Sequence, residues 1–202
     1  MRTVLVAMHY QNEVLHAAGK IKVGVAEGAE GRGAVVDAAS RLLAFARGNG
    51  IPVVSVRIAF RPDHADVIQN CAIFRNVVAG KAMIDGSWGA EFHDGLGPLP
   101  GEFVVKHSRV NAFYGSPLEE VLRSLKAERL IMAGVATNSV VLTTVACAAD
   151  MGYEVIVVSD ACSSGRPELH ESSLENMKLV ADVMDLDGLV RHLAGEGVGG
   201  LL

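Results

Sequence analysis

The sequence predicts an α/β protein in which helices cover both faces of a mainly parallel, six-stranded sheet. Of its 202 residues, 50% are hydrophobic and only 5% are aromatic. A Val-, Ala- and Leu-rich composition favours parallel strands, because such strands are buried on both faces. Apolar runs of strand length also alternate along the chain with segments of helical periodicity, as in βα repeats. We expect one domain over residues 1–202, with a loose Gly-rich tail from about residue 195.

The charge and cysteine content exclude several classes of partner. A net charge of -5 without any Lys/Arg block argues against nucleic acid and against an anionic membrane surface. Three cysteines without a CxxC pattern indicate a reducing compartment. The apolar run from Val4 to Met8 is too short for a signal peptide, and no run reaches membrane-spanning length. We therefore expect a soluble, cytoplasmic protein.

The first third of the chain predicts a strand, a loop, a helix and a second strand. The first strand covers Thr3 to Met8 and breaks into polar residues at His9. Residues 20–32 lack periodicity, so we predict a loop that could form a lid. Apolar residues at helical spacing predict a helix over residues 33–47, and the aliphatic run at residues 52–60 predicts the second strand.

The middle of the chain is less regular. Residues 65–100 contain no clear long element. A third strand is predicted from Glu102 to Lys106. Ser116 and Glu119 have the spacing of a capping box with Pro at the first helical position, which predicts a helix to about Lys126.

A buried strand at residues 130–135 leads through a polar turn into a long apolar helix, Ser139 to Met151. Asn138 or Ser139 could cap this helix. Such a strand-to-helix turn presents free N–H groups and the positive end of the helix dipole to a ligand. The helix is apolar almost all round, so it is covered by another subunit or packed deep in the domain. We therefore expect a homo-oligomer, a dimer or a tetramer.

The last quarter of the chain predicts the remaining strands. A fifth strand covers residues 153–159 and a helix follows over residues 167–178. Residues 179–183 predict an edge strand, and residues 185–193 a short final helix.

Three segments resemble motifs of the isochorismatase-like hydrolases, the superfamily of nicotinamidases, N-carbamoylsarcosine amidohydrolases and isochorismatases. Residues 134–137, Gly-Val-Ala-Thr, resemble the turn that precedes the nucleophilic Cys of that family. Residues 9–13 resemble its Asp-x-Gln-Asn-Asp/Glu motif, and residues 106–113 resemble the segment of its catalytic Lys. The resemblance spans nearly the whole chain and implies a three-layer α/β/α sandwich with a Rossmann-like strand order.

All three catalytic positions implied by this resemblance are changed. His9 stands at the position of the Asp general base and Val140 at that of the Cys. Counting back from Ala112 and Phe113 puts His107 at the position of the Lys, whereas a one-residue slip would put Lys106 there. Because strand side chains alternate, only one of the two can face the site.

The function that we favour is a cysteine-independent hydrolase acting on a small, possibly anionic molecule. His9 would be the general acid/base and His107 its partner, titrating together near neutral pH. The resemblance implies that the N–H groups of Ala136 and Val140 hold an oxyanion. Further substrate contacts are expected from polar or aromatic side chains in or near the motifs: Gln11, Arg61, Trp88, Arg109, Thr137 and Asn138.

Two other interpretations remain open. One is an inert protein that kept the fold and binds a small molecule or serves as an oligomeric scaffold. The other is a metal site at His9 and His107, completed by His64 or His93. The favoured interpretation needs neither a metal nor a cofactor, and it treats Cys147 and Cys162 as packing residues.

Overall fold

The computed structural model describes residues 1–25 and 29–197, and its centre is a six-stranded sheet in the order β3-β2-β1-β4-β5-β6. Every neighbouring pair is parallel. The predicted fold class is therefore confirmed, although β6 begins three residues later than predicted. The strands are β1 (Thr3–Met8), β2 (Val53–Ile58), β3 (Phe103–His107), β4 (Arg129–Gly134), β5 (Glu154–Val158) and β6 (Asp182–Met184).

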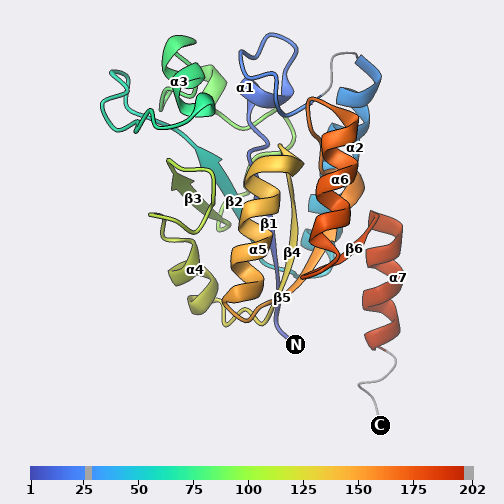
Figure 1. Ribbon diagram of the computed structural model, residues 1–202. Helices are drawn as coiled ribbons and strands as arrows, with labels where there is room; N and C mark the ends of the chain where they lie inside the picture. The colour runs from blue at the N-terminus through green and yellow to red at the C-terminus, as the bar shows by residue number, and fades with distance from the viewer. Residues whose placement is uncertain (26–28, 198–202) are drawn as a thin grey trace.

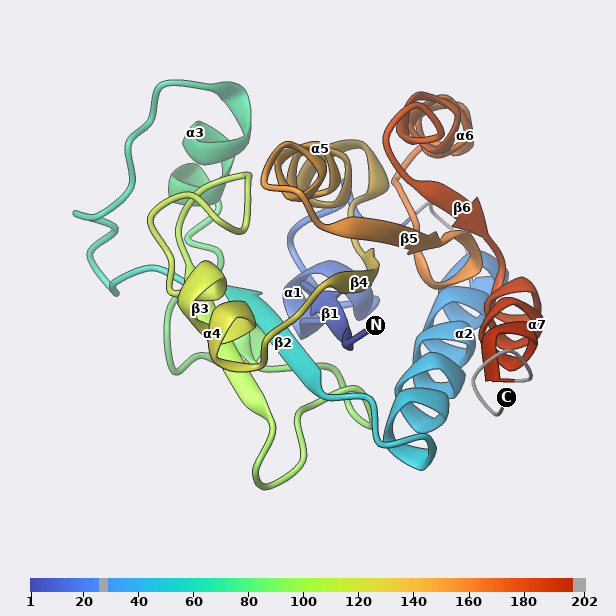
Figure 2. The same ribbon diagram turned by 90° about the horizontal axis from the view of Figure 1, so that it is seen from below.

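Helices cover both faces of the sheet, which gives three layers (Figures 1 and 2). One face carries α4 (Leu118–Ser124), α5 (Leu142–Asp150) and α6 (Pro167–Met177). The other carries α2 (Ala29–Gly48) and α7 (Leu186–Gly197). The crossover from β1 to β2 runs in one direction along the sheet, and the crossovers from β3 to β6 run in the opposite direction. Because each crossover is right-handed, reversing its direction moves its helix to the opposite face of the sheet.

The carboxyl ends of the strands lie at one edge of the molecule, beneath α1 (Asn12–Leu15) and α3 (Ala72–Ala79) (Figure 1). The direction of the chain order reverses between β1 and β4, and ligands of α/β proteins bind at such a reversal. Gly134 allows the close approach of these strands, because a Cβ there would lie 2.3 Å from the Met8 carbonyl oxygen. This reversal is where the candidate site lies.

Two helices differ from the sequence-based expectation. Helix α3 lies within residues 65–100, where no long element was predicted; it has eight residues and buries only Phe74 and Val77, so its apolar periodicity is short. Helix α2 begins at Ala29, so the predicted loop of residues 20–32 ends earlier, and its residues 26–28 lie outside the described range.

The predicted helix caps are also corrected. Neither Asn138 nor Ser139 caps α5, because a π-helical turn, Thr137–Val141, leads into it: Ala136 is the N-cap residue of this turn and Val141 that of α5. Glu119 does not complete a capping box, since its carboxylate forms an ion pair with Arg123 one turn later.

Two expectations from the sequence, the homo-oligomer and the loose C-terminal tail, stay predictions. Helix α5 buries Thr144, Val145 and Ala148 while Cys147 is half-buried, so the expected oligomer remains a prediction. Helix α7 extends to Gly197, and the rest of the predicted loose tail, residues 198–202, lies outside the described range. No helix in the described part of the chain is long and apolar enough to cross a bilayer.

Candidate active site

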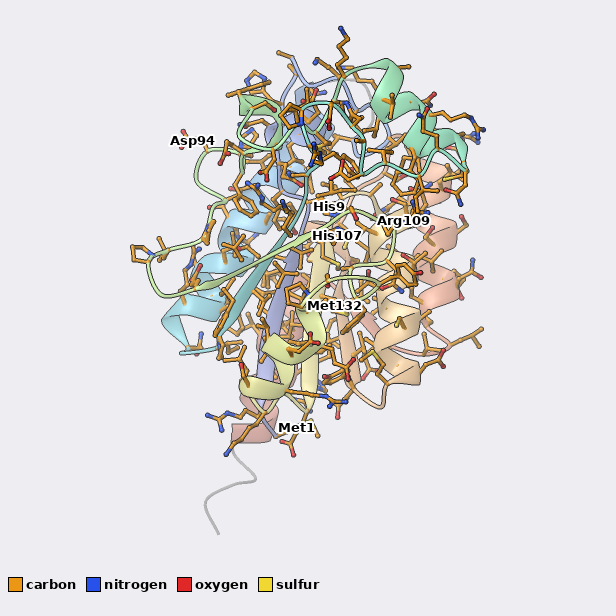
Figure 3. The ribbon with its side chains drawn as sticks, turned by 90° about the vertical axis from the view of Figure 1, so that its left-hand side faces the viewer. Met1, His9, Asp94, His107, Arg109 and Met132 are labelled. Atoms are coloured by element: carbon orange, nitrogen blue, oxygen red, sulfur yellow. The ribbon has the colours of Figure 1, made fainter. Side chains whose placement is uncertain are left out.

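The two histidines selected from the sequence meet at the carboxyl edge of the sheet. Their Nε2 atoms lie 2.5 Å apart and their ring centroids 4.8 Å apart. His9 follows β1 and His107 ends β3, and β2 lies between these strands. The two rings therefore meet over the end of β2, across two strand spacings that together measure about 10 Å. Figure 3 shows both rings beside Arg109.

The backbone around each ring fixes its direction. His9 has φ of 57°, a left-handed conformation that non-glycine residues rarely adopt outside functional sites. Its N–H donates to the Val56 carbonyl at 2.9 Å, which holds this conformation against β2. On β3, His107 is buried, whereas Lys106 is half-exposed and pairs with Asp85 at 2.9 Å. Strand alternation thus turns His107, and not Lys106, towards His9.

Burial keeps the histidine pair neutral. Desolvation lowers the pKa of His9 well below 6.5, and the adjacent His107 lowers it further. Desolvation lowers the pKa of His107 to about 4, against a smaller opposing effect of the Asn111 backbone. At pH 7 one N–H therefore lies between the two Nε2 atoms, with one ring donating and the other accepting.

A small, mainly apolar cavity of about 50 Å³ adjoins His9. Its wall includes Ala136, Ser139 and Val140 from the turn after β4, so His9 and Val140 share one site. The Val135–Ala136 peptide bond is cis. No cysteine lines this cavity within the described part of the chain. The remaining wall is aliphatic or aromatic apart from Arg109: Val14, Ile21, Val23, Ile58, Ile73, Phe74, Val77, Met83, Val110 and Val135.

Arg109 places a positive charge in this apolar wall. Its guanidinium carbon lies 4.1 Å from the centre of the Phe74 ring. Its side chain donates to the Ile68 carbonyl at 3.4 Å and to the Asn70 side-chain oxygen at 3.1 Å. In the described ranges it pairs with no carboxylate, so its charge is not neutralised by an acidic neighbour.

Gln11 is a buried clamp beneath the site and does not line the cavity. Its Nε2 donates to the carbonyls of Ile58 (2.9 Å) and Ala90 (2.7 Å), and its Oε1 accepts from the Ile58 N–H at 2.9 Å. The side chain therefore joins the ends of β1 and β2 to the loop at residues 88–92.

We expect Gln11→Ala to lower the free energy of unfolding by about 1–3 kcal/mol, because Ile58 and Ala90 would be left with unpaired buried groups. Urea unfolding measures the change, and the exposed Gln69→Ala is the matched control. A change no larger than that of the control would show that the clamp contributes nothing.

Three other predicted contacts lie away from the cavity. Arg61 is exposed and pairs with Asp63 at 2.9 Å. Trp88 is 52% exposed and meets His16 edge to face. Thr137 is fully buried, and its hydroxyl pairs with His170 Nδ1 at 2.8 Å. Their positions in the motifs suggested site contacts, but loop packing directs these side chains elsewhere.

Asn138 faces a second, outer groove of about 660 Å³, which shares Ile21, Val23, Ile73 and Ser139 with the inner cavity.

Sequence reasoning missed the site residues on α3 and did not assign those on residues 20–23. The available signals were the short apolar spacing of α3 and the two lysines, Lys20 and Lys22, in the predicted loop.

The remaining histidines and cysteines lie apart from the pair. His64 Nε2 contacts the Ala82 carbonyl at 2.9 Å, and His93 lies near His16. Among residues 1–25 and 29–197 no group of three or more His, Cys, Asp and Glu side chains could hold a metal ion. Cys162 is buried, which raises its pKa to about 12 and disfavours the reactive thiolate.

Comparison with known proteins places the chain in a family. The model of the isochorismatase domain matches residues 3–188. The ureidoacrylate amidohydrolase of Methylorubrum extorquens is 28% identical over 189 residues, covering 87% of this chain and 76% of the relative. The maleamate amidohydrolase of Pseudomonas putida is 29% identical over 166 residues, covering 80% and 77%.

A solved structure agrees with this result. An isochorismatase family protein from Desulfovibrio vulgaris superposes with a TM-score of 0.83 at 30% identity, covering 96% of this chain and 98% of that one. The resemblance in the motifs is therefore confirmed over most of the chain by sequence and by fold. The protein belongs to the isochorismatase family.

Proposed function

We propose that the protein hydrolyses an amide bond in a small anionic molecule by acid/base catalysis without a cysteine nucleophile. The observation that carries this proposal is the His9–His107 contact, with 2.5 Å between Nε2 atoms, in which His9 lines a cavity that no cysteine lines in the described ranges. Val140 stands at the position at which the resemblance implies the family's Cys.

The proposed mechanism assigns one proton to each neutral ring. We place the proton of His107 on Nδ1, which has no hydrogen-bond partner among the described residues. His107 Nε2 is then the acceptor, His9 Nε2 carries the shared proton, and His9 Nδ1 has a free lone pair.

In this assignment His9 Nδ1 takes a proton from water as the water oxygen bonds to the amide carbon. The same proton then passes to the nitrogen of the leaving amine as the C–N bond breaks, so the pair ends the cycle neutral. His107 orients the His9 ring and shares the positive charge that develops on it. The low pKa values weaken the base but keep its acceptor form fully populated at pH 7.

The N–H groups of Ala136 and Val140 are proposed to bind the oxyanion that forms on the carbonyl oxygen. Both residues line the cavity beside His9, in the turn that leads into α5. Backbone donors of this kind act from a fixed position and need no particular side chain, so they do not depend on a cysteine at residue 140.

An anionic substrate is supported by Arg109 and by the relatives. Arg109 brings an unneutralised positive charge to the wall of an otherwise apolar cavity. The relatives' names specify ureidoacrylate and maleamate as substrates, which are carboxylates that carry an amide-type bond. The proposed substrate class is therefore a small carboxylate with a hydrolysable amide.

Removing all three thiols tests independence from cysteine. We expect the Cys71→Ser, Cys147→Ser, Cys162→Ser triple variant to keep kcat within about threefold of the wild type, because no proposed step uses a thiol. Amide hydrolysis is followed by released ammonia, and circular dichroism checks the fold. Loss of turnover in a folded Cys162→Ser single variant would instead indicate a thiol mechanism.

A further inference from the structure

The inner cavity is too small to hold a whole substrate. Its volume of about 50 Å³ accepts only a few non-hydrogen atoms, whereas small-molecule sites commonly have volumes of about 300–1,000 Å³. The outer groove has about 660 Å³ and shares four wall residues with the cavity. A substrate whose amide lies at His9 must therefore extend into the outer groove.

The groove lies between the segment Lys20–Val23, helix α3 and the turn after β4. Its charged side chains are Lys20 and Lys22, and no acidic side chain of the described residues lines it. Neither lysine pairs with a carboxylate in the described part of the chain. These two charges give the groove a positive potential.

The segment that carries the lysines is held at both ends. The Lys20 N–H donates to the Glu13 carboxylate at 3.0 Å, and the Gly165 N–H donates to the Val23 carbonyl at 2.7 Å. Glu13 is a buried residue of α1. The two ammonium groups therefore project from an anchored backbone, which lowers the entropy lost when they bind a ligand.

Each lysine also keeps donors for a ligand. Lys20 Nζ donates to the Lys81 carbonyl at 2.9 Å and Lys22 Nζ to the Ala17 carbonyl at 3.3 Å. An ammonium has three donors, so each retains two. Asn138 adds an amide, because its side-chain oxygen already accepts from Ser164 at 2.8 Å and its NH₂ remains as a donor.

We propose that the groove is the outer half of the substrate site, in which Lys20, Lys22 and Asn138 bind a carboxylate at the end remote from the cleaved amide. This rests on the proposed function, since the position of the reacting amide is taken from it. The proposed substrate is then an extended mono-amide of a dicarboxylic acid (a half-amide). Its apolar middle would lie against Ile21, Val23 and Ile73.

A half-amide and the diamide of the same chain length differ only in the remote carboxylate, so comparing their affinities measures what the carboxylate contributes to binding. The probes are succinamate, glutaramate and adipamate, each compared with succinamide, glutaramide or adipamide. Calorimetry measures binding to the full chain, and ammonia release is followed separately. We expect the wild type to bind at least one half-amide about tenfold more tightly than its diamide, as two exposed charge contacts together would provide.

The Lys20→Met, Lys22→Met double variant keeps the aliphatic side chains but removes the charges. We expect it to lose most of the preference for the half-amide, with an unchanged Kd for the diamide. The Lys20→Arg, Lys22→Arg variant should restore the preference. Lys178→Met, an exposed lysine that pairs with Glu175, controls for net charge and should retain it.

The proposal is overturned if no half-amide binds more tightly than its diamide, or if the Met variant keeps the preference. It is also overturned if Lys178→Met loses as much as the groove variant, since the effect would then be one of total charge. A lysine-dependent preference without ammonia release would support the groove and count against the proposed hydrolysis, so the two can fail separately.

Discussion

Replacing His9 by Asn is expected to lower kcat for an amide substrate by about 10²–10⁴-fold, the usual loss when a general acid/base is removed. Asn retains a hydrogen-bonding side chain but cannot carry the proton from water to the leaving amine. KM should change little, because the substrate contacts of Arg109 and the groove remain. Steady-state kinetics on an amide found by screening measures both parameters.

His107→Asn should also lower kcat, by its effect on His9. His107 is buried behind His9 and is absent from the cavity wall, so it is a positioning residue. The matched control is Lys106→Met, one residue earlier on β3 and on the solvent side of the strand, which should retain kcat. Wild-type kcat in both histidine variants would contradict the mechanism, and no turnover in the wild type on any amide would favour an inert binding protein.

The pH profile distinguishes His107 from a residue that only supports the fold. The sequence suggested that activity would change near neutral pH, but burial lowers both histidine pKa values, to about 4 for His107. We therefore expect kcat to stay constant as pH falls through 6.5 and to decline only well below that value. His107→Asn should move this acid limb, because His9 loses the imidazole in contact with its Nε2, whereas a residue that only supports the fold would leave the limb in place.

The same pair should make folding stability depend on pH. Each histidine binds a proton below pH 6.5 in the unfolded chain, but His107 does so only below about 4 in the folded protein. Between these values the unfolded state holds more protons, so stability rises with pH. It should be highest above about pH 6.5, fall as pH drops towards 4, and lose about 3 kcal/mol through His107.

Urea unfolding between pH 7 and 4 measures this dependence. Carboxylates such as Asp85, whose pKa is lowered by Lys106 and Arg57, also contribute at the acidic end, so the comparison is between variants. His107→Asn should lose less stability over this range than the wild type, whereas the exposed His16→Asn should follow the wild type. A His107→Asn curve parallel to the wild type would show that His107 is not a buried neutral group.

The sequence by itself determined the fold class and the approximate location of the site. Strands β1 and β4 were recognisable because burial on both faces requires continuous apolar runs, such as Val4–Met8 and Leu130–Ala133. Helix α3 was missed because an eight-residue helix that buries two side chains leaves little periodicity. His9 and Val140 were selected because they stand at catalytic positions implied by the family resemblance, and each follows a buried parallel strand, which places them at the same edge of the sheet.

Only the tertiary structure decided which side chains face the cavity. The choice between Lys106 and His107 depended on a register of one residue, which the pairing of Ile58 with His107 fixes. Gln11, Trp88 and Thr137 had the right positions in the chain, but contacts with residues distant in sequence direct them elsewhere, and Arg61 pairs locally with Asp63. The pKa values of His9 and His107 likewise arise from burial and from contact between residues 98 positions apart, which no local pattern contains.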